Sequence, residues 1–182
     1  MNWPYQSKGI GLNDSAKPAY NGLAYQPHPV PAMTATSLVL AFPATDPADT
    51  AGFMLAKLAY HTDAWDVAED LRNNVSAIMV IDTRSEAHYA AGHIPGAISL
   101  PHRLMDASST AQLDPGKTYI TYCDGIGCNG STKGAYKMAS LGFRVKEMLG
   151  GLDFWQRDGH PLTTGTEPGS LSGHTPAILC GC

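Results

Sequence analysis

The sequence has few charged residues, and acidic residues slightly outnumber basic ones. Charged side chains make up 15% of the 182 residues, and the formal net charge is -4. Domains that bind nucleic acid or an anionic membrane surface usually carry a basic patch, so this balance argues against both partners. We expect the solvent-exposed surface to depend instead on Ser, Thr, Asn and Gly.

Long hydrophobic runs are also missing. No apolar segment approaches the roughly 20 residues that a membrane-spanning helix needs. The opening "MNWPYQSKGIGLND" has no cationic stretch followed by an apolar one, so we expect no signal peptide. These features predict a cytoplasmic protein with no membrane partner, in which cysteines stay reduced unless they take part in chemistry.

Cysteine is scarce as well, and the four cysteines lie in two close pairs, Cys123 with Cys128 and Cys180 with Cys182. A disulfide framework would spread its cysteines so as to close long loops, which this arrangement does not do. The spacings Cys-x4-Cys and Cys-x-Cys also fit a four-thiolate zinc site poorly. We therefore predict no metal and no cofactor, and we favour a redox or nucleophilic role for the thiols.

The two ends of the chain differ in composition from its middle. Residues 1–45 are rich in proline and predict an extended N-terminal arm, in which only "TSLVLAF" at 36–42 is apolar enough to pair as a strand. Residues 163–182 are rich in Gly, Ser, Thr and Pro and predict a flexible tail without a core. A single folded domain is therefore expected over 46–162, a length that suffices for a full core.

Within that domain, apolar runs alternate with amphipathic segments. "AIMVID" at 77–82 is a continuous apolar run of strand length, as expected for a strand buried on both faces. Further strands are predicted at 58–62, 97–100, 118–122 and 144–149, and helices at 47–57, 64–73, 86–92, 131–142 and 152–159. Strands that alternate with helices predict an α/β fold with a parallel sheet.

The loop "YCDGIGCNGS" at 122–131 joins a predicted strand to a predicted helix. Ligands of open α/β sheets bind beyond the carboxyl ends of the strands, so Cys123 stands where chemistry is usually placed. The three glycines of the loop let successive backbone N–H groups form an anion-binding nest, and the following helix N-terminus adds to that field. Such a nest stabilises a thiolate, so we interpret Cys123 as a nucleophile rather than a buried residue of a tight turn.

Three segments around this loop resemble the rhodanese-like (sulfurtransferase) domain family, in the order which that family shows. They are "IDTRSEAHYAAGHIPGAISLP" at 81–101, "YITYCDG" at 119–125 and "LGFRVKEMLGGLDFWQRDGHPL" at 141–162. Gly-His-Ile-Pro-Gly-Ala and Gly-Gly-x3-Trp-x3-Gly-x-Pro are the specific signatures within them. The resemblance covers about 58–162 and implies a rhodanese-like α/β fold, an open parallel five-stranded sheet with helices on both faces.

The same resemblance implies a sulfurtransferase. Cys123 would take a sulfane sulfur from a small-molecule donor (thiosulfate or a persulfide) and hold it as a persulfide, and a thiol or cyanide would then remove it. The backbone amides of the loop would hold the anionic group. The residues of this substrate-binding loop are Asp124, Gly125, Ile126, Gly127, Cys128, Asn129, Gly130 and Ser131.

The loop departs from the family in one respect. The family usually carries an Arg five or six residues after the nucleophile, where this chain has Cys128 and Asn129, and Lys133 is the nearest cation along the sequence. A bidentate guanidinium matches phosphate geometry and Asn does not, so a phosphatase activity is disfavoured. A donor less anionic than thiosulfate, such as a low-molecular-weight persulfide, is favoured for the same reason.

Several roles stay open on sequence grounds. Cys128 is either a resolving thiol that closes a disulfide with Cys123 or a small filler in the turn. Cys180 and Cys182 are candidates to relay sulfur from Cys123, or they have no role. The alternative to an enzyme is a non-catalytic rhodanese-like module that binds a partner or senses redox state. A homodimer is a further open question.

Other polar residues of the domain receive structural interpretations. Asp82 and Arg84 follow a strand, and we expect them to form an ion pair or to hydrogen-bond to neighbouring loops rather than to react. We expect His93 to hydrogen-bond within a turn and Trp155 to pack in the core.

Overall fold

A computed structural model describes residues 37–174, and the chain divides after Thr45 into two units that are described separately. In the described part of the first unit, Val39–Ala41 forms a 3-10 helix, η1, and its apolar side chains are exposed. The prediction of a strand at 36–42 is therefore wrong. An apolar run becomes a strand only where another strand accepts its backbone hydrogen bonds, and no described strand pairs with this segment.

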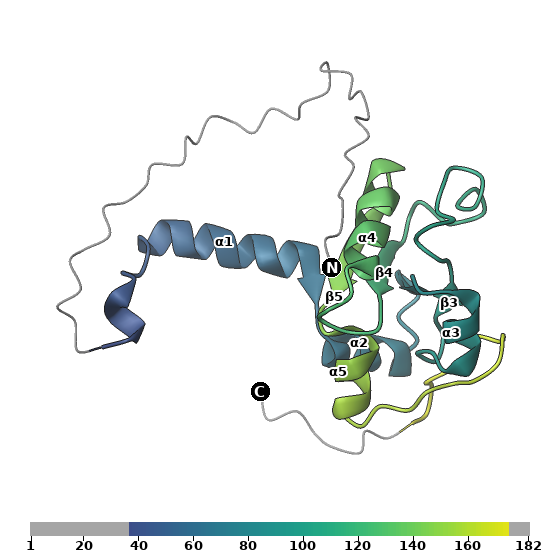
Figure 1. Ribbon diagram of the computed structural model, residues 1–182. Helices are drawn as coiled ribbons and strands as arrows, with labels where there is room; N and C mark the ends of the chain where they lie inside the picture. The colour runs from purple at the N-terminus through teal and green to yellow at the C-terminus, as the bar shows by residue number, and fades with distance from the viewer. Residues whose placement is uncertain (1–36, 175–182) are drawn as a thin grey trace, which may run out of the picture. The chain divides into compact units, whose positions relative to one another are not determined.

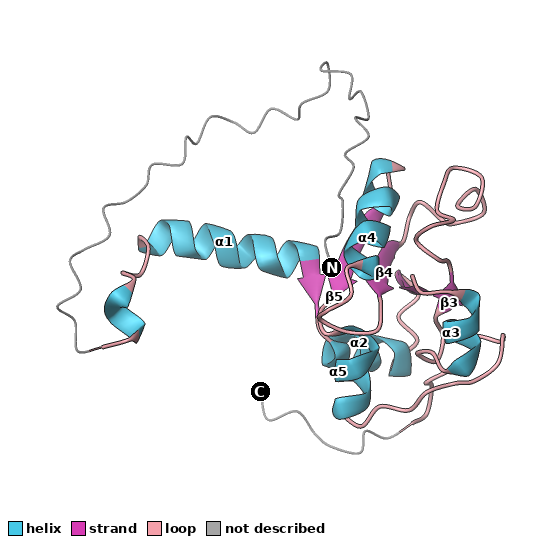
Figure 2. Ribbon diagram, viewed as in Figure 1, coloured by secondary structure: helices cyan, strands magenta, loops and turns pink. Residues whose placement is uncertain are grey.

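The second unit contains a five-stranded sheet in which every described pair of strands is parallel (Figures 1 and 2). The strand order is β1-β5-β4-β2-β3. The strands are β1 (His61–Thr62), β2 (Ile78–Asp82), β3 (Ile98–Ser99), β4 (Thr118–Tyr122) and β5 (Arg144–Met148). The chain runs outward from β2 to β3 and then outward in the other direction from β4 to β5. The strand order therefore reverses between β2 and β4, the point at which open α/β sheets bind ligands.

Five α-helices accompany the sheet, and the first three are each capped by a side chain at the N-terminus. The helices are α1 (Pro47–Tyr60), α2 (Ala64–Arg72), α3 (Glu86–Ala91), α4 (Gly130–Ser140) and α5 (Gly151–Arg157). Asp46 caps α1 by accepting a hydrogen bond from the backbone N–H of Ala48 at 2.8 Å. Helix α1 extends three residues beyond the predicted end at 57, so the strand predicted at 58–62 is reduced to its last two residues.

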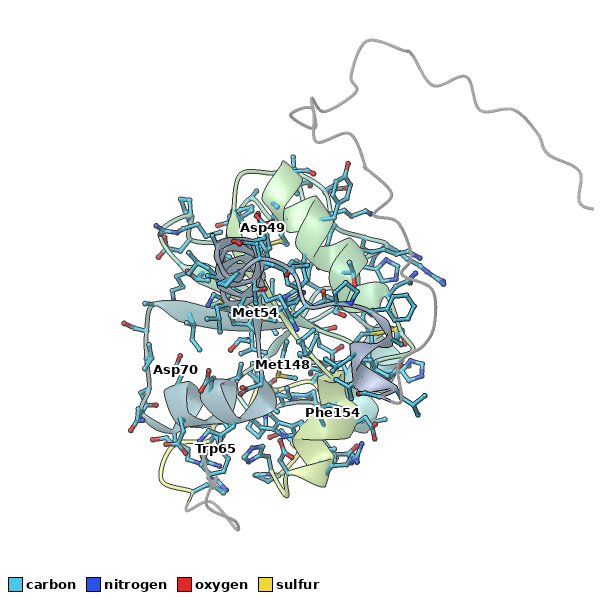
Figure 3. The ribbon with its side chains drawn as sticks, turned by 90° about the vertical axis from the view of Figure 1, so that its left-hand side faces the viewer. Asp49, Met54, Trp65, Asp70, Met148 and Phe154 are labelled. Carbon is cyan, nitrogen blue, oxygen red and sulfur yellow. A yellow bond between two sulfur atoms is a disulfide. The ribbon has the colours of Figure 1, made fainter. Side chains whose placement is uncertain are left out.

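Helices cover both faces of the sheet, as the sequence predicts. On one face, α2, α3 and α5 contribute to a core cluster that includes Val80, Met148 and Trp155, with Met148 labelled in Figure 3. On the other face, Met138 of α4 packs with Ile81 and other apolar side chains. Because neighbouring residues of β2 face opposite clusters, this strand is buried on both sides, which explains its continuous apolar sequence.

The segment after Leu162 is not a tail without a core, at least as far as His174. The backbone of Thr163 exchanges two hydrogen bonds of 2.9 Å with His93, and the N–H of Gly96 donates to Pro168 O at 2.6 Å. Leu171 is almost fully buried in the cluster beneath α2 and α5. The prediction of a flexible tether from residue 163 is therefore wrong for 163–174. Cys180 and Cys182 lie outside the described residues.

None of the helices in the described range is both long and apolar enough to cross a bilayer. The longest, α1, has no buried residue and exposes Phe53, Leu55 and Leu58.

Candidate functional site

A cavity of about 570 Å³ lies at the carboxyl ends of β2 and β4, next to the reversal of strand order. Cys123 follows β4 directly, and Thr83 and Arg84 follow β2. The backbone N–H of Thr83 donates to Tyr122 O at 3.0 Å, which holds the two strand ends together. The cavity is lined by residues that include Arg84, His88, His102, Arg103, Cys123 and Cys128. The nucleophile predicted from the sequence therefore opens onto this cavity.

The Cys loop, residues 123–130, folds back on itself so that its two cysteines meet. The backbone N–H of Cys128 donates to Gly125 O at 2.9 Å and closes a tight turn. In this structure Cys123 and Cys128 form a disulfide, with 6.3 Å between their Cα atoms. Cys123 is 3% exposed and Cys128 is half-buried. Of the two roles left open for Cys128, the geometry fits the resolving thiol.

The sulfur of Cys123 lies against the first residue of α4. An ideal Cβ placed on Gly130 would lie 2.8 Å from Cys123 Sγ and 3.3 Å from Cys128 Sγ, so only glycine leaves room for both sulfurs. Position 130 opens an eleven-residue helix, whose N-terminal N–H groups carry a partial positive charge. An anionic sulfur at this position is stabilised by the helix.

Backbone donors of the loop are free to bind an anion. Among the described residues, the N–H groups of Gly125, Ile126 and Gly127 have no acceptor in the protein. Ile126 is 79% exposed, so this side of the loop faces solvent. These donors are the ones that a nest of successive N–H groups requires.

A second loop anchors the base of the Cys loop. At the start of α5, the N–H of Leu152 donates to Cys123 O at 2.9 Å and the N–H of Asp153 donates to Asp124 O at 2.8 Å. This approach needs Gly151, whose φ is +56° and whose added Cβ would collide with Cys123 O. The Gly-Gly signature of the sequence thus has a positional role that sequence reasoning did not assign.

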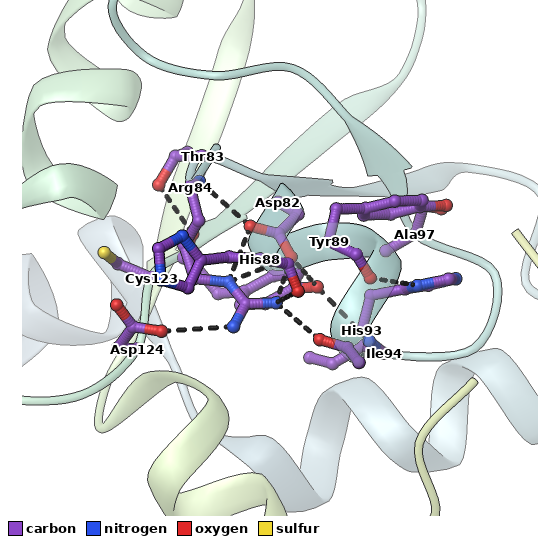
Figure 4. Close-up of polar contacts among 12 residues, drawn as sticks. Asp82, Thr83, Arg84, His88, Tyr89, His93, Ile94, Ala97, Cys123 and Asp124 are labelled. Atoms are coloured by element: carbon purple, nitrogen blue, oxygen red, sulfur yellow. Dashed lines mark hydrogen bonds and ion pairs between the residues drawn. The ribbon is translucent and has the colours of Figure 1, made fainter. Parts of the chain in front are cut away.

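The opposite wall of the cavity is a buried ion pair (Figure 4). Arg84 Nη2 donates to Asp82 Oδ2 at 2.6 Å and to Gly92 O at 2.6 Å, and Nη1 donates to Asp124 Oδ1 at 3.1 Å. Tyr122 Oη also donates to Asp82 Oδ2, at 2.6 Å. The expectation of a structural pair between Asp82 and Arg84 is confirmed. Its extension to Asp124 was missed, because 40 residues separate Arg84 from Asp124.

These contacts set the charge states of the wall. Burial opposes the charge of Arg84, but hydrogen bonds to Asp82 and the charge of that carboxylate raise the pKa of the guanidinium above its ordinary value. Burial and the charge of Asp82 likewise raise the pKa of Tyr122. The guanidinium of Arg84 therefore stays charged and the phenol of Tyr122 stays neutral. Both groups hydrogen-bond to Asp82 and stabilise this wall of the cavity.

The far edge of the cavity is positively charged. His102 and Arg103 line it, and Lys137 Nζ donates to His102 O at 2.8 Å. Burial, followed by the charges of Lys133, Arg103 and Lys137, lowers the pKa of His102. Three cations, Lys133, Arg103 and Lys137, therefore lie close enough to His102 to affect its pKa. Of these cations the sequence analysis named only Lys133 of α4, and it missed Arg103, which lies in the segment after β3.

The remaining polar residues that the sequence analysis named lie around the loop and in the core. Asp124 and Asn129 are exposed, and Asn129 is the N-cap of α4 without a side-chain cap bond. Ser131 lies in the first turn of that helix, where its hydroxyl donates to Glu147 Oε1 at 2.7 Å. His93 is buried and hydrogen-bonded to Tyr89 O at 2.9 Å, as expected for a structural residue.

Three possible metal-ligand atoms meet at the loop, those of Cys123, Asp124 and Cys128, all within 4.8 Å of one another. A structural zinc site uses four such ligands, so this set is incomplete. The two sulfurs are also bonded to each other, and a metal binds thiolates.

Comparisons with known proteins place this geometry in a family. The BH2092 protein of Bacillus halodurans is 39% identical in sequence and superposes with a TM-score of 0.64, over 65% of this chain and 87% of that one. The rhodanese-like domain of the Anabaena sp. protein Alr3790 is 25% identical, with a TM-score of 0.52 over 67% of this chain and 88% of that one.

A curated relative is the HTH-type transcriptional regulator Rv0324 of Mycobacterium tuberculosis, 32% identical over 108 residues, or 59% of this chain. The match spans about half (47%) of that regulator's length. The family model for the rhodanese-like domain matches residues 65–158, which is more than half of the chain and contains the cavity, the ion pair and the Cys loop. The chain therefore belongs to the rhodanese-like domain family.

Proposed function

We propose that the protein is a sulfurtransferase in which Cys123 carries the transferred sulfur as a persulfide. In the reduced protein, the Cys123 thiolate attacks the sulfane sulfur of a donor, thiosulfate or a persulfide, and the remainder of the donor leaves. A thiol acceptor or cyanide then attacks the outer sulfur of the persulfide and restores the thiolate. The observation that carries the proposal is the position of Cys123 Sγ, packed against the first residue of α4 and open to the cavity.

The loop supplies what such a reaction needs. A thiolate and a persulfide are both anions, and the start of α4 places a partial positive charge beside them. The unpaired N–H groups of Gly125, Ile126 and Gly127 are further donors of the same loop, on the side that lines a second, smaller pocket beside Cys128. Attack by the thiolate form of Cys123 needs no general base, so none of these groups has to move a proton.

The cationic edge of the cavity favours a negatively charged donor. Arg103 lines the cavity with Cys123, and the positive charges around His102 extend that edge toward Lys133 and Lys137. This group offsets the missing Arg of the loop, so thiosulfate is again a reasonable donor alongside an anionic persulfide. The exposed position of Arg103 makes its contribution modest.

A non-catalytic module that senses redox state is the second candidate. Two observations favour it: the disulfide between Cys123 and Cys128, and the relationship to a transcriptional regulator. In that case the Cys loop would change between dithiol and disulfide forms, and a partner would read the difference.

Steady-state turnover separates the two candidates. The reduced full-length protein is supplied with thiosulfate or a persulfide donor and with cyanide or a thiol acceptor, and product is measured against Cys123→Ser. A sulfurtransferase gives sustained turnover that depends on Cys123 and follows double-displacement kinetics. A sensor gives at most one equivalent of product.

A phosphomonoester serves as the control substrate. The Cys loop has no guanidinium to bind a phosphate in two hydrogen bonds, so hydrolysis is expected to be negligible. Efficient hydrolysis that requires Cys123 would replace the sulfurtransferase proposal with a phosphatase.

A further inference from the structure

The two sulfurs of the Cys loop are positioned to react with each other. The turn closed between Cys128 and Gly125 brings Cys128 back over Cys123, and the missing side chain at Gly130 lets both sulfurs lie against the start of α4. The disulfide between the two sulfurs forms within this loop of the fold. The backbone that would hold a Cys123 persulfide therefore also holds a second thiol within bonding reach of Cys123 Sγ.

Both sulfurs open onto the same cavity. Cys123 and Cys128 are among its lining residues, together with Asp124, His102 and Arg103. A donor that delivers sulfur to Cys123 therefore enters the space that Cys128 faces. A reducing thiol can enter by the same route and reach the disulfide.

We propose that Cys128 is a resolving thiol that discharges the Cys123 persulfide as sulfide when no external acceptor is present. This inference rests on the proposed function, because it begins from the persulfide. It gives the same site a second outcome: reductive release of sulfide, instead of transfer of sulfur to an acceptor.

The reaction balances without an external oxidant. The Cys128 thiolate attacks Sγ of Cys123, a bond forms between the two Sγ atoms, and the bond from Cys123 Sγ to the outer sulfur breaks. The outer sulfur takes a proton from solvent, leaves with the electron pair as hydrosulfide, and takes a second proton from solvent to become hydrogen sulfide. The sulfane sulfur is thus the oxidant and is reduced, while the two cysteines are oxidised to the disulfide.

The cycle is completed by a reductant of the thiol class. A dithiol, or two monothiols in succession, returns the disulfide to two thiols and readies Cys123 for another donor. Since the attack is intramolecular, Cys128 acts at an effective concentration of about millimolar or more, so it competes with dilute external acceptors. Abundant acceptor thiol would favour transfer, and scarce acceptor would favour sulfide release.

The test uses a single loading of the full chain. Protein is reduced, freed of reductant under anaerobic conditions, and given one equivalent of a sulfane donor without any acceptor. Released sulfide is measured over time, and peptide mapping locates the added sulfur and the disulfide. Wild type is compared with Cys128→Ser, and both are repeated with Cys180→Ser and Cys182→Ser to remove the other thiols.

Wild type is expected to release about one equivalent of sulfide and to end with the Cys123–Cys128 disulfide. Cys128→Ser should keep the added sulfur on Cys123 and release sulfide at least about tenfold more slowly, because the intramolecular nucleophile is gone. Sulfide release that is equally fast in Cys128→Ser, or that depends on Cys180 and Cys182, would overturn the inference while leaving the proposed function intact.

The two proposals fail in different ways. If Cys128→Ser gains no sulfur on Cys123, the proposed function fails and the inference fails with it. If Cys128→Ser forms a stable persulfide but wild type also keeps its sulfur without forming a disulfide, only the role of Cys128 is refuted.

Discussion

Cys123 lies between a cavity wall whose polar groups are paired with each other and a loop whose backbone donors are free. On the cavity wall, the guanidinium of Arg84 is 6% exposed and binds Asp82, Asp124 and backbone carbonyls. On its solvent-facing side, the Cys loop exposes Ile126 and leaves neighbouring N–H groups without an acceptor among the described residues. The difference indicates that the cavity wall holds the site in shape, while the loop is free to bind and react.

The largest expected effect is a loss of stability when the ion pair of the cavity wall is broken. Asp82→Ala removes the carboxylate that binds Arg84 and Tyr122, and leaves a buried guanidinium without its partner. Breaking a buried pair in this way costs about 3–5 kcal/mol in the free energy of unfolding. Chemical denaturation of the reduced protein measures the change.

The matched control for Asp82→Ala lies on the loop. Ile126→Ala truncates an exposed side chain and should change the free energy of unfolding by no more than about 0.5 kcal/mol. Equal losses of unfolding free energy in the two variants would mean that the cavity wall and the Cys loop do not differ as described.

Gly130→Ala should affect activity more than stability. The added methyl group would lie 2.8 Å from Cys123 Sγ, so the sulfur has to move away from the start of α4. A displacement of this kind is expected to slow persulfide formation by about ten- to a hundredfold. Samples quenched at successive times and analysed by intact-mass spectrometry give the rate of persulfide formation.

Gly127→Ala provides the control in the same loop. No atom lies within 4 Å of the position that its Cβ would take, so persulfide formation should proceed at the wild-type rate. If both glycine variants lose activity equally, loop flexibility rather than contact with the sulfur explains the effect.

Arg103→Ala tests the cationic edge, and a smaller effect is expected. Loss of an exposed charge should raise the KM for thiosulfate about two- to fivefold, since such contacts contribute up to about 1 kcal/mol. The rise should shrink at high salt and should be absent with a sulfane donor that carries no charge. Arg157→Ala, an exposed arginine outside the cavity, is the control. Equal changes in KM for charged and uncharged donors would refute the role of the edge.

The smallest effect concerns His160, which packs against Trp155 away from the cavity. Burial, followed by the charge of Arg72, lowers the pKa of His160. The folded protein therefore resists a proton that the unfolded chain binds below about pH 6.5, and stability should fall as the pH drops below that value. His160→Phe should show a shallower decline between about pH 7 and about pH 5 in denaturation experiments. An unchanged slope would contradict the assignment.

The sequence predicted those parts of the fold that depend on local patterns. The apolar run of β2 and the alternation of strand and helix patterns are local signals, and the predicted sheet and helices are present. The position of Cys123 at the end of β4 followed from the same reasoning.

The parts that escaped prediction depend on contacts between distant residues. The hydrogen bond from Arg84 to Asp124 and the approach of Gly151 to the Cys123 carbonyl join separate strand ends. The backbone hydrogen bonds of Thr163 and the buried side chain of Leu171 hold a segment whose composition resembles that of a flexible tail. None of these contacts leaves a periodic signal in the sequence.

The central claim is that Cys123 carries the transferred sulfur, and mapping that sulfur in the reduced protein tests it most directly. Reduced wild type and Cys128→Ser are exposed to a sulfane donor, alkylated and digested, and the peptide containing the Cys loop is sequenced by mass spectrometry. The account predicts the added mass of one sulfur atom on Cys123, retained in Cys128→Ser. Added sulfur on Cys128 with Cys123 unmodified in wild type, or no added sulfur on Cys123 in Cys128→Ser, would contradict it.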